Sequence, residues 1–202
     1  VSAKGTGTRT FSISGNHPGI SISSGGVVTV ESTTAVGIYY ETVTATDSKG
    51  AIGQKAITIR VNSPVTLTKG LNVVTTQGRA DSATGYVADS GTVIATGGTK
   101  NYVYTIQSAN AVALPSGITI DSVTGVISVS NAVLAGTYIE SVTATDSMTS
   151  AATQLITILV NPKVVVTGPS LIVTTYNIPQ TRTSDTVTGG TVDALTFSRN
   201  LI

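Results

Sequence analysis

Residues 37–48 read Gly-Ile-Tyr-Tyr-Glu-Thr-Val-Thr-Ala-Thr-Asp-Ser, and residues 136–147 read Gly-Thr-Tyr-Ile-Glu-Ser-Val-Thr-Ala-Thr-Asp-Ser, 99 positions later. The same offset aligns Ile57-Thr-Ile-Arg-Val-Asn62 with Ile156-Thr-Ile-Leu-Val-Asn161, so that 14 of 26 compared positions are identical. Self-similarity at a fixed period indicates repeated structural units. The chain of 202 residues therefore contains tandem domains of about 95–100 residues.

The repeated stretches carry the pattern of β-strands. In 57–62 and 156–161, Ile or Val occupies every second position, and a period of two predicts a strand with one face on a core. Turn signals such as 47–50 and 124–125 recur along the chain, and such punctuation is typical of antiparallel sandwiches or barrels. We therefore predict an all-β fold of tandem antiparallel β-sandwich domains, each long enough to bury its own core.

The composition excludes several classes of protein. Thr, Val and Ser account for 84 of the 202 residues, only 10% are charged, the net charge is +1 and Cys is absent. Cysteine-ligated metal sites are therefore excluded, and no charged surface for nucleic acid is expected. No apolar run approaches the roughly 20 residues that span a bilayer, so we expect no membrane span in this segment.

The repeat also predicts three domains. Residues 1–63 form a repeat that lacks its first strands, residues 64–162 form a complete repeat, and residues 163–202 begin a third. Thr96-Gly-Gly-Thr99 recurs as Thr188-Gly-Gly-Thr191, each time before a strand-like run. We interpret the chain as an excerpt of a longer array. The alternative is a polymerising subunit whose C-terminal strands complete the next molecule.

Two motifs carry a family resemblance. Pro-Ser-Gly-Ile-Thr-Ile-Asp-x-x-Thr-Gly-Val-Ile-Ser-Val at 115–129 precedes the Gly-Thr-Tyr-x-x-x-Val-Thr-Ala-Thr-Asp-Ser motif at 136–147. Together they resemble the putative-Ig and dystroglycan-type cadherin-like repeats of very large secreted bacterial surface proteins. The resemblance covers both copies and implies Ig-like or cadherin-like β-sandwiches. It further implies modules that act as spacers or adhesive units rather than as enzymes.

Asp47 and Asp146 are the candidate metal ligands. Each follows Ala-Thr at a predicted strand end, and the resemblance to cadherin repeats implies a calcium-binding aspartate there. Calcium takes about six to eight oxygen ligands, whereas the linkers at 61–64 and 160–162 contain no acidic residue. We therefore favour Asp residues that close a hairpin through an Asx-turn, and expect no cofactor other than the calcium alternative.

Glu41 and Glu140 recur at one position of the repeat and share strand parity with Val43 and Val142. Regular pleating points them inward, where a lone carboxylate is costly. A bulge or a rim position would leave them hydrated. Alternatively, each acid belongs to a buried ion pair, or it promotes a Lys–Asn isopeptide cross-link, as in some Gram-positive adhesins.

The remaining candidates are aromatic. His17 is the only histidine and lies in the turn-like Asn16-His17-Pro18-Gly19, so we expect an exposed turn residue and neither a catalytic triad nor a zinc site. Four tyrosines could line a sugar platform, although core or sheet-surface positions are favoured. They are Tyr39, Tyr40, Tyr102 and Tyr104.

These observations predict a non-enzymatic extracellular structural segment of a microbial surface protein, such as a stalk, adhesin, surface layer or filament. The alternatives are a phage or virus fibre or decoration protein, which would place the chain in a virion, and a carbohydrate-binding accessory module. The expected partners are neighbouring repeats of the same chain. Because the predicted edge strands carry few Lys or Pro residues, we also expect any self-association to use edge or terminal strands.

Overall fold

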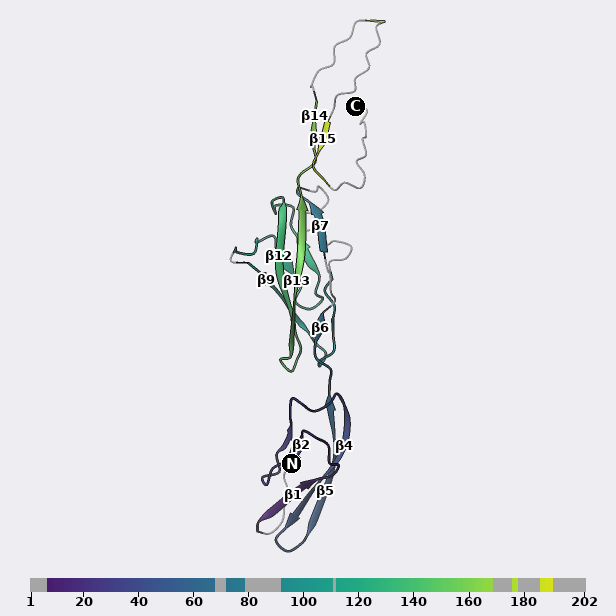
Figure 1. Cartoon of the computed structure of the whole chain (residues 1–202), viewed down its shortest axis with the longest axis vertical. Helices are drawn as coiled ribbons and strands as arrows, with labels where there is room; N and C mark the ends of the chain where they lie inside the picture. The colour runs from purple at the N-terminus through teal and green to yellow at the C-terminus, as the bar shows by residue number, and fades with distance from the viewer. Residues whose placement is uncertain are drawn as a thin grey trace. The chain divides into compact units, whose positions relative to one another are not determined.

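The computed structural model describes residues 7–67, 72–78, 92–110, 112–168, 176–177 and 186–190. Every regular element in these residues is a β-strand (Figure 1), which confirms the predicted all-β class. The chain divides into two compact units, which we call unit 1 (1–63) and unit 2 (64–202).

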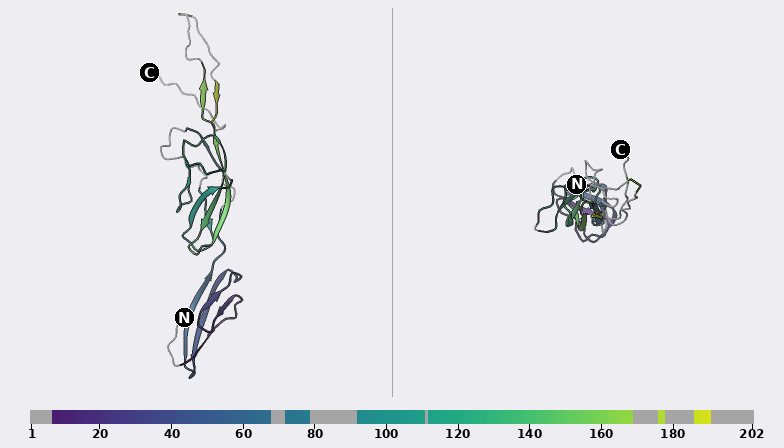
Figure 2. Two further views of the ribbon diagram at one scale, coloured as in Figure 1. Left: turned by 90° about the vertical axis from the view of Figure 1, so that its left-hand side faces the viewer. Right: turned by 90° about the horizontal axis from the view of Figure 1, so that it is seen from above.

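Unit 1 is built around a long hairpin. Its strands are β1 (Arg9–Ile13), β2 (Ile20–Ile22), β3 (Val28–Val30), β4 (Gly37–Asp47) and β5 (Ile52–Val61). The order β1-β4-β5 makes an antiparallel three-stranded sheet, and β2 pairs with β3. Strands β4 and β5 run side by side over ten paired positions (Figures 1 and 2), from Gly37↔Val61 to Thr46↔Ile52.

Unit 2 repeats this hairpin and has further strands before and after it. Its strands are β6 (Thr66–Leu67), β7 (Asn72–Thr76), β8 (Ala95–Thr96), β9 (Val103–Ser108), β10 (Ile118–Ile120), β11 (Ile127–Val129), β12 (Gly136–Thr145), β13 (Ala151–Asn161), β14 (Val165–Thr167) and β15 (Thr186–Thr188). The main sheet has the order β7-β13-β12-β9, and three two-stranded sheets pair β10 with β11, β6 with β8 and β14 with β15. All these pairs are antiparallel except β7–β13, which is parallel.

The core of unit 2 lies between its sheets. Val73, Val142 and Ile158 of the main sheet are fully buried and belong to one apolar cluster with Ile118 and Ile127 of the β10–β11 sheet. Burial of β-branched side chains from both faces gives the unit a β-sandwich core. In β12 and β13, the apolar residues at every second position thus point into the core, as the period of two predicts.

The core of unit 1 is less enclosed. Val43 and Ala45 of β4 are buried, and so is Ile20 of β2. The inward row of β5, however, is only half-buried at Ile57, Ile59 and Val61. Since the corresponding row of β13 is fully buried, the two copies of this strand differ in what covers them.

The predicted third repeat falls mainly outside the described residues. What is described there resembles the start of unit 2: β14 pairs with β15 as β6 pairs with β8. In both places the second strand is followed by two glycines with positive φ, Gly97-Gly98 and Gly189-Gly190. A third repeat in 163–202 stays a prediction, which this shared pairing supports.

Candidate functional site

Glu41 is the most enclosed charged residue of unit 1. It lies on β4 with Tyr39 and Val43, and pleating directs all three to the inner face. The residue is 2% exposed. One carboxylate oxygen, Oε1, lies 2.6 Å from His17 Nδ1, and the other, Oε2, accepts a hydrogen bond of 3.2 Å from Ser14 Oγ.

The turn after β1 is shaped around this carboxylate. Gly15 has φ +68°, and a Cβ at this position would lie 2.8–2.9 Å from both carboxylate oxygens of Glu41. Ser14 Oγ also accepts a hydrogen bond from the backbone N–H of Thr42. The ring of His17 packs edge-on against Tyr39, with 4.9 Å between the ring centroids. The turn thus closes over Glu41 from several sides.

His17 is therefore more than the exposed turn residue that its sequence context predicts. Its side chain is 43% exposed, yet Nδ1 contacts a fully buried carboxylate. An ionised carboxylate only accepts hydrogen bonds, so with Glu41 in that form Nδ1 is the donor of this contact. The arrangement is not a catalytic triad, because Glu41 stands between Ser14 and His17, whereas nucleophilic catalysis needs the imidazole next to the hydroxyl.

Glu140, the counterpart of Glu41 in unit 2, has a different environment. It is 3% exposed, and its Oε2 has no hydrogen-bond partner among the described residues. Burial raises the pKa of the Glu140 carboxyl, and a hydrogen bond from the backbone N–H of Ala109 opposes that rise in pKa. Because His17 is the only histidine of the chain, no second copy of the histidine contact exists.

Both repeated glutamates are buried, which excludes one of the three environments that the sequence allows. A hydrated bulge or rim position is wrong for Glu41 and for Glu140, because both are enclosed within regular ladders of paired residues. An ion-pair geometry is present at Glu41. The isopeptide cross-link stays a prediction. Lys4, Lys69, Lys100 and Lys163 are the lysines considered for it, and Lys4 and Lys69 lie outside the described residues.

The two aspartates close hairpins. Asp47 Oδ1 accepts hydrogen bonds of 2.9 Å from the backbone N–H groups of Lys49 and Ala51, between β4 and β5. Asp146 Oδ1 does the same with Met148 and Ser150, between β12 and β13. These are the contacts of Asx-turns.

Asp146 also ties this hairpin to the loop that precedes β9. Its Oδ2 accepts a hydrogen bond of 2.7 Å from the backbone N–H of Thr99. This bond, followed by those from Ser150 and Met148, lowers the pKa of Asp146 although desolvation raises it. Across the described ranges, no three His, Cys, Asp or Glu side chains gather as a metal site would require, and calcium at Asp47 or Asp146 stays a prediction.

The four tyrosines fall into different environments. Tyr104 is buried in the core, where its hydroxyl accepts a hydrogen bond from the backbone N–H of Ala95. Tyr39 and Tyr102 are half-buried, and Tyr40 is 76% exposed. Tyr102 and Tyr104 have tilted rings 6.4 Å apart. These four side chains therefore do not form one exposed, flat platform for a sugar.

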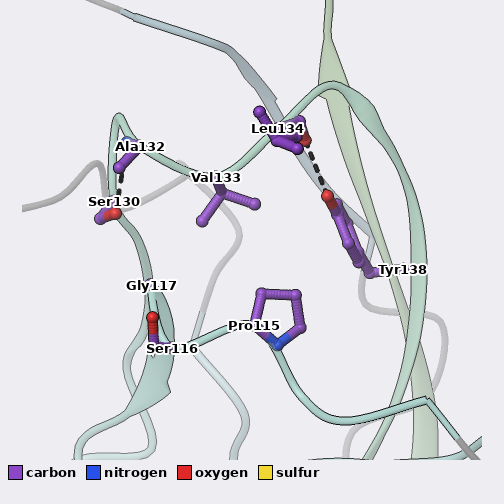
Figure 3. A pocket seen from close by; sticks show the side chains of 8 residues that line it. All are labelled: Pro115, Ser116, Gly117, Ser130, Ala132, Val133, Leu134 and Tyr138. Carbon is purple, nitrogen blue, oxygen red and sulfur yellow. Dashed lines mark hydrogen bonds between the residues drawn. The ribbon is translucent and has the colours of Figure 1, made fainter.

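A pocket of about 480 Å³ lies beside β12 in unit 2 (Figure 3). Pro115, Val133 and Leu134 give it apolar walls, and the ring of Tyr138 lies along another side. The Tyr138 hydroxyl is engaged, since it donates to the backbone oxygen of Leu134 at 2.8 Å. With no acid or base in its lining, this pocket offers no groups for acid–base chemistry.

Comparison with protein families identifies the second unit. Residues 64–161 match the model of the family described as Putative Ig domain (He_PIG). Unit 2 contains a domain of this family. The match confirms the predicted resemblance. No enzyme family is found, and no curated protein matches the chain.

Solved structures with a similar fold include several sets of cadherin repeats. Mouse cadherin-23 EC22–24 is 15% identical, with a TM-score of 0.40, over 77% of this chain and 53% of that one. Protocadherin gamma B2 extracellular cadherin domains 3–6 are 19% identical, with a TM-score of 0.41, over 82% and 44%. Drosophila N-cadherin EC1–4 is 15% identical, with a TM-score of 0.37, over 78% and 43%. The chain thus spans about half the length of these structures, and at such identities the likeness concerns the fold alone.

Proposed function

We propose that this chain is a non-enzymatic structural segment of an extracellular protein on a microbial surface, where it serves as part of a stalk, adhesin, surface layer or filament. The observation that carries the proposal is the tandem repetition of one β-sandwich unit, with 14 of 26 positions identical between the hairpin strands of the two copies. Repeated units extend a chain by adding the same module again, which suits a spacer.

The side chains of the described residues support a structural role. Three of the four acids that the sequence repeats are engaged in the fold: Asp47 and Asp146 hold hairpins, and Glu41 holds the turn after β1. None of the described residues forms a helix long and apolar enough to cross a bilayer. The abundant hydroxyls of Thr and Ser provide the polar outer faces that charged residues usually provide.

Localisation on intact cells of the source organism tests this proposal. An antibody raised against the purified chain is applied to intact cells before and after brief external proteolysis, with an abundant cytoplasmic protein as the control. We expect labelling of intact cells that proteolysis removes while the control protein stays intact. Labelling that appears only after lysis would contradict the proposal. Copurification with phage particles, together with unlabelled cells, would favour the virion alternative.

A further inference from the structure

The outer face of the main sheet of unit 2 exposes a cluster of aliphatic side chains. In the sheet β7-β13-β12-β9 (Figure 1), the inward residues build the core and the alternate residues face outward. Four large outward residues remain exposed, Leu155 by 61% and the other three by 37–42%. They are Val74 of β7, Ile139 of β12, and Leu155 and Leu159 of β13, and we call them the outer patch.

The register of the strands brings the outer patch together. Leu159 lies opposite Val74 on the neighbouring strand. Ile139 lies opposite Thr157, which separates Leu155 from Leu159 along β13, so Ile139 is the diagonal neighbour of both leucines. Long side chains in diagonal positions of a sheet can reach each other. The four residues thus form one continuous apolar surface, and such a surface on a folded domain marks an interaction site.

The outer patch belongs to unit 2 and is not a property of the repeat. At the offset of 99, Leu155 and Leu159 correspond to Ala56 and Arg60 of β5. Those two residues are also exposed and face outward. The three residues between them, Ile-Thr-Ile, are identical in both copies. The inward pattern of the strand is therefore kept without leucine at either outward position, and the two leucines add something that the fold does not need.

The rest of the outer face is polar but uncharged. At the outward positions of the four strands, as the structure bounds them, no residue is charged, and Thr occurs more often than any other residue. Hydroxyl and amide groups both donate and accept hydrogen bonds, whereas a carboxylate only accepts and an ammonium group only donates. Two copies of this face can therefore satisfy each other's polar groups, and their contact buries no unpaired charge.

The face is also large enough for a stable contact. Its strands are 5 to 11 residues long, and at about 3.4 Å per residue and about 4.8 Å per strand they outline a flat area of roughly 500 Å². Side chains that stand on a sheet expose more area than this outline. The accessible area therefore approaches the roughly 800 Å² that each partner buries in a stable complex.

We propose that the outer face of unit 2 binds the same face of a second copy of this chain, with the outer patch inside the contact. Both copies contribute the same residues, so the contact is isologous and closes as a dimer. Two sheets that pack face to face in this way lie about 10 Å apart. This surface is separate from the edge and terminal strands that the sequence favours for self-association, and the contact does not depend on where the protein is located.

Sedimentation velocity of the full chain, from about 1 μM to about 1 mM, tests the dimer. The native chain is expected to form dimers as the concentration rises. The double variant Leu155→Ala/Leu159→Arg gives β13 the outward residues that β5 already carries, so the strand pattern is kept. We expect it to weaken the dimer roughly 30-fold or more, because each copy loses two apolar contacts and gains a charge.

The matched control is Val123→Arg. Val123 is 77% exposed between β10 and β11, in the opposite layer of the sandwich, so this variant adds the same charge to the same unit and should leave the dimer unchanged. Thermal unfolding shows whether each variant is folded, and Leu159→Arg alone replaces the double variant if that one unfolds. A strict monomer at all concentrations, or equal weakening by Val123→Arg, would overturn the proposal.

A mixing experiment tests whether both copies use the same face. Native chain that carries a fluorophore on Lys49→Cys, in a turn of unit 1, is mixed with an excess of unlabelled double variant. In an isologous dimer, the variant lacks its half of the contact, so it should bind the labelled chain roughly 5-fold or more weakly than unlabelled native chain does. Binding as tight as that of the native chain would show that the outer face contacts a different surface, and would disprove the isologous dimer.

Discussion

Strands β5 and β13 share one sequence pattern, but they differ in the strands that pair with them. Each contains Ile-Thr-Ile-x-Val, followed in the sequence by Asn, and pairs with a long strand on one side. Strand β13 also pairs with β7 on its other side, and its inward residues are almost completely buried. The inward residues of β5 stay half-buried. A period of two therefore decides which face of a strand is inward, whereas the depth of burial depends on the strands beside it.

Truncation of the inward row gives the largest expected effect in this comparison. Ile158→Ala removes side-chain volume from a fully enclosed site and should cost about 2–5 kcal/mol of unfolding free energy in unit 2. Ile59→Ala should cost unit 1 about half as much, because the native side chain already contacts water. Hydrogen exchange of β13 and β5 amides, at concentrations where the chain is monomeric, measures the two costs separately. Equal costs would show that β5 is covered within the monomer.

The buried glutamates provide a second contrast between the units. Glu41 contacts His17 and Ser14, whereas one oxygen of Glu140 lacks a hydrogen-bond partner among the described residues. His17→Ala should therefore destabilise unit 1 by about 1–3 kcal/mol, because it leaves a buried carboxylate with one fewer donor. Urea titrations followed by hydrogen exchange in each unit measure this change, and unit 2 is the internal control.

A double variant sharpens that result. His17→Ala leaves the Glu41 carboxylate without its histidine contact. If this is the source of the destabilisation, His17→Ala should lower the unfolding free energy less when Glu41→Gln is already present. A cost that is the same in both backgrounds would attribute the effect to the packing of His17 on Tyr39 instead.

Glu140→Gln should have a smaller effect of the opposite sign. Because burial raises the pKa of Glu140, the folded unit binds its proton more tightly than the unfolded chain does. The ionised form therefore weakens folding at neutral pH. We expect the variant to be about 1 kcal/mol more stable than the native unit at pH 7. That gain should fade as the pH drops through the raised pKa of Glu140 towards the ordinary carboxyl value.

The difference in stability between the Glu140→Gln variant and the native protein at each pH separates the effect of Glu140 from the titration of the other acids. Asp146 behaves in the opposite way, since its pKa is lowered and its stabilising contribution is lost as the pH falls below the ordinary aspartate value. Thermal unfolding at several pH values, with the exposed Glu31→Gln as control, provides the measurement. A gain that does not depend on pH would contradict an electrostatic origin.

Calcium should have the smallest effect on either unit. The Oδ1 atoms of Asp47 and Asp146 already accept backbone hydrogen bonds, and no three His, Cys, Asp or Glu side chains gather around a metal-sized site within the described residues. We therefore expect no measurable shift in unfolding temperature on adding calcium or a chelator. A rise with calcium that disappears in Asp146→Asn would establish the calcium site that the resemblance to cadherin repeats implies.

The sequence predicted that the Glu41 side chain points inward, because the alternation of side chains along a strand can be read from the residues of that strand alone. It did not reach the contact with His17, which is 24 positions away and whose turn-like context predicts a solvent-exposed ring. Similarly, turn chemistry predicted Asx-turns at Asp47 and Asp146, but no local signal pointed to the bond between Asp146 and Thr99, 47 positions apart.

The amino-acid sequence by itself determined the all-β class, the repeat, the face of each long strand and the positions of the hairpin turns. Each of these depends on local preferences and on periodicity, which a single stretch of chain contains. Only the tertiary structure decided that β7 covers β13 in parallel and that β5 has an open edge among the described residues. It also decided that one buried glutamate has a histidine partner and its counterpart has none. These outcomes depend on residues distant in sequence, because burial and hydrogen bonding are set by whatever the fold brings alongside.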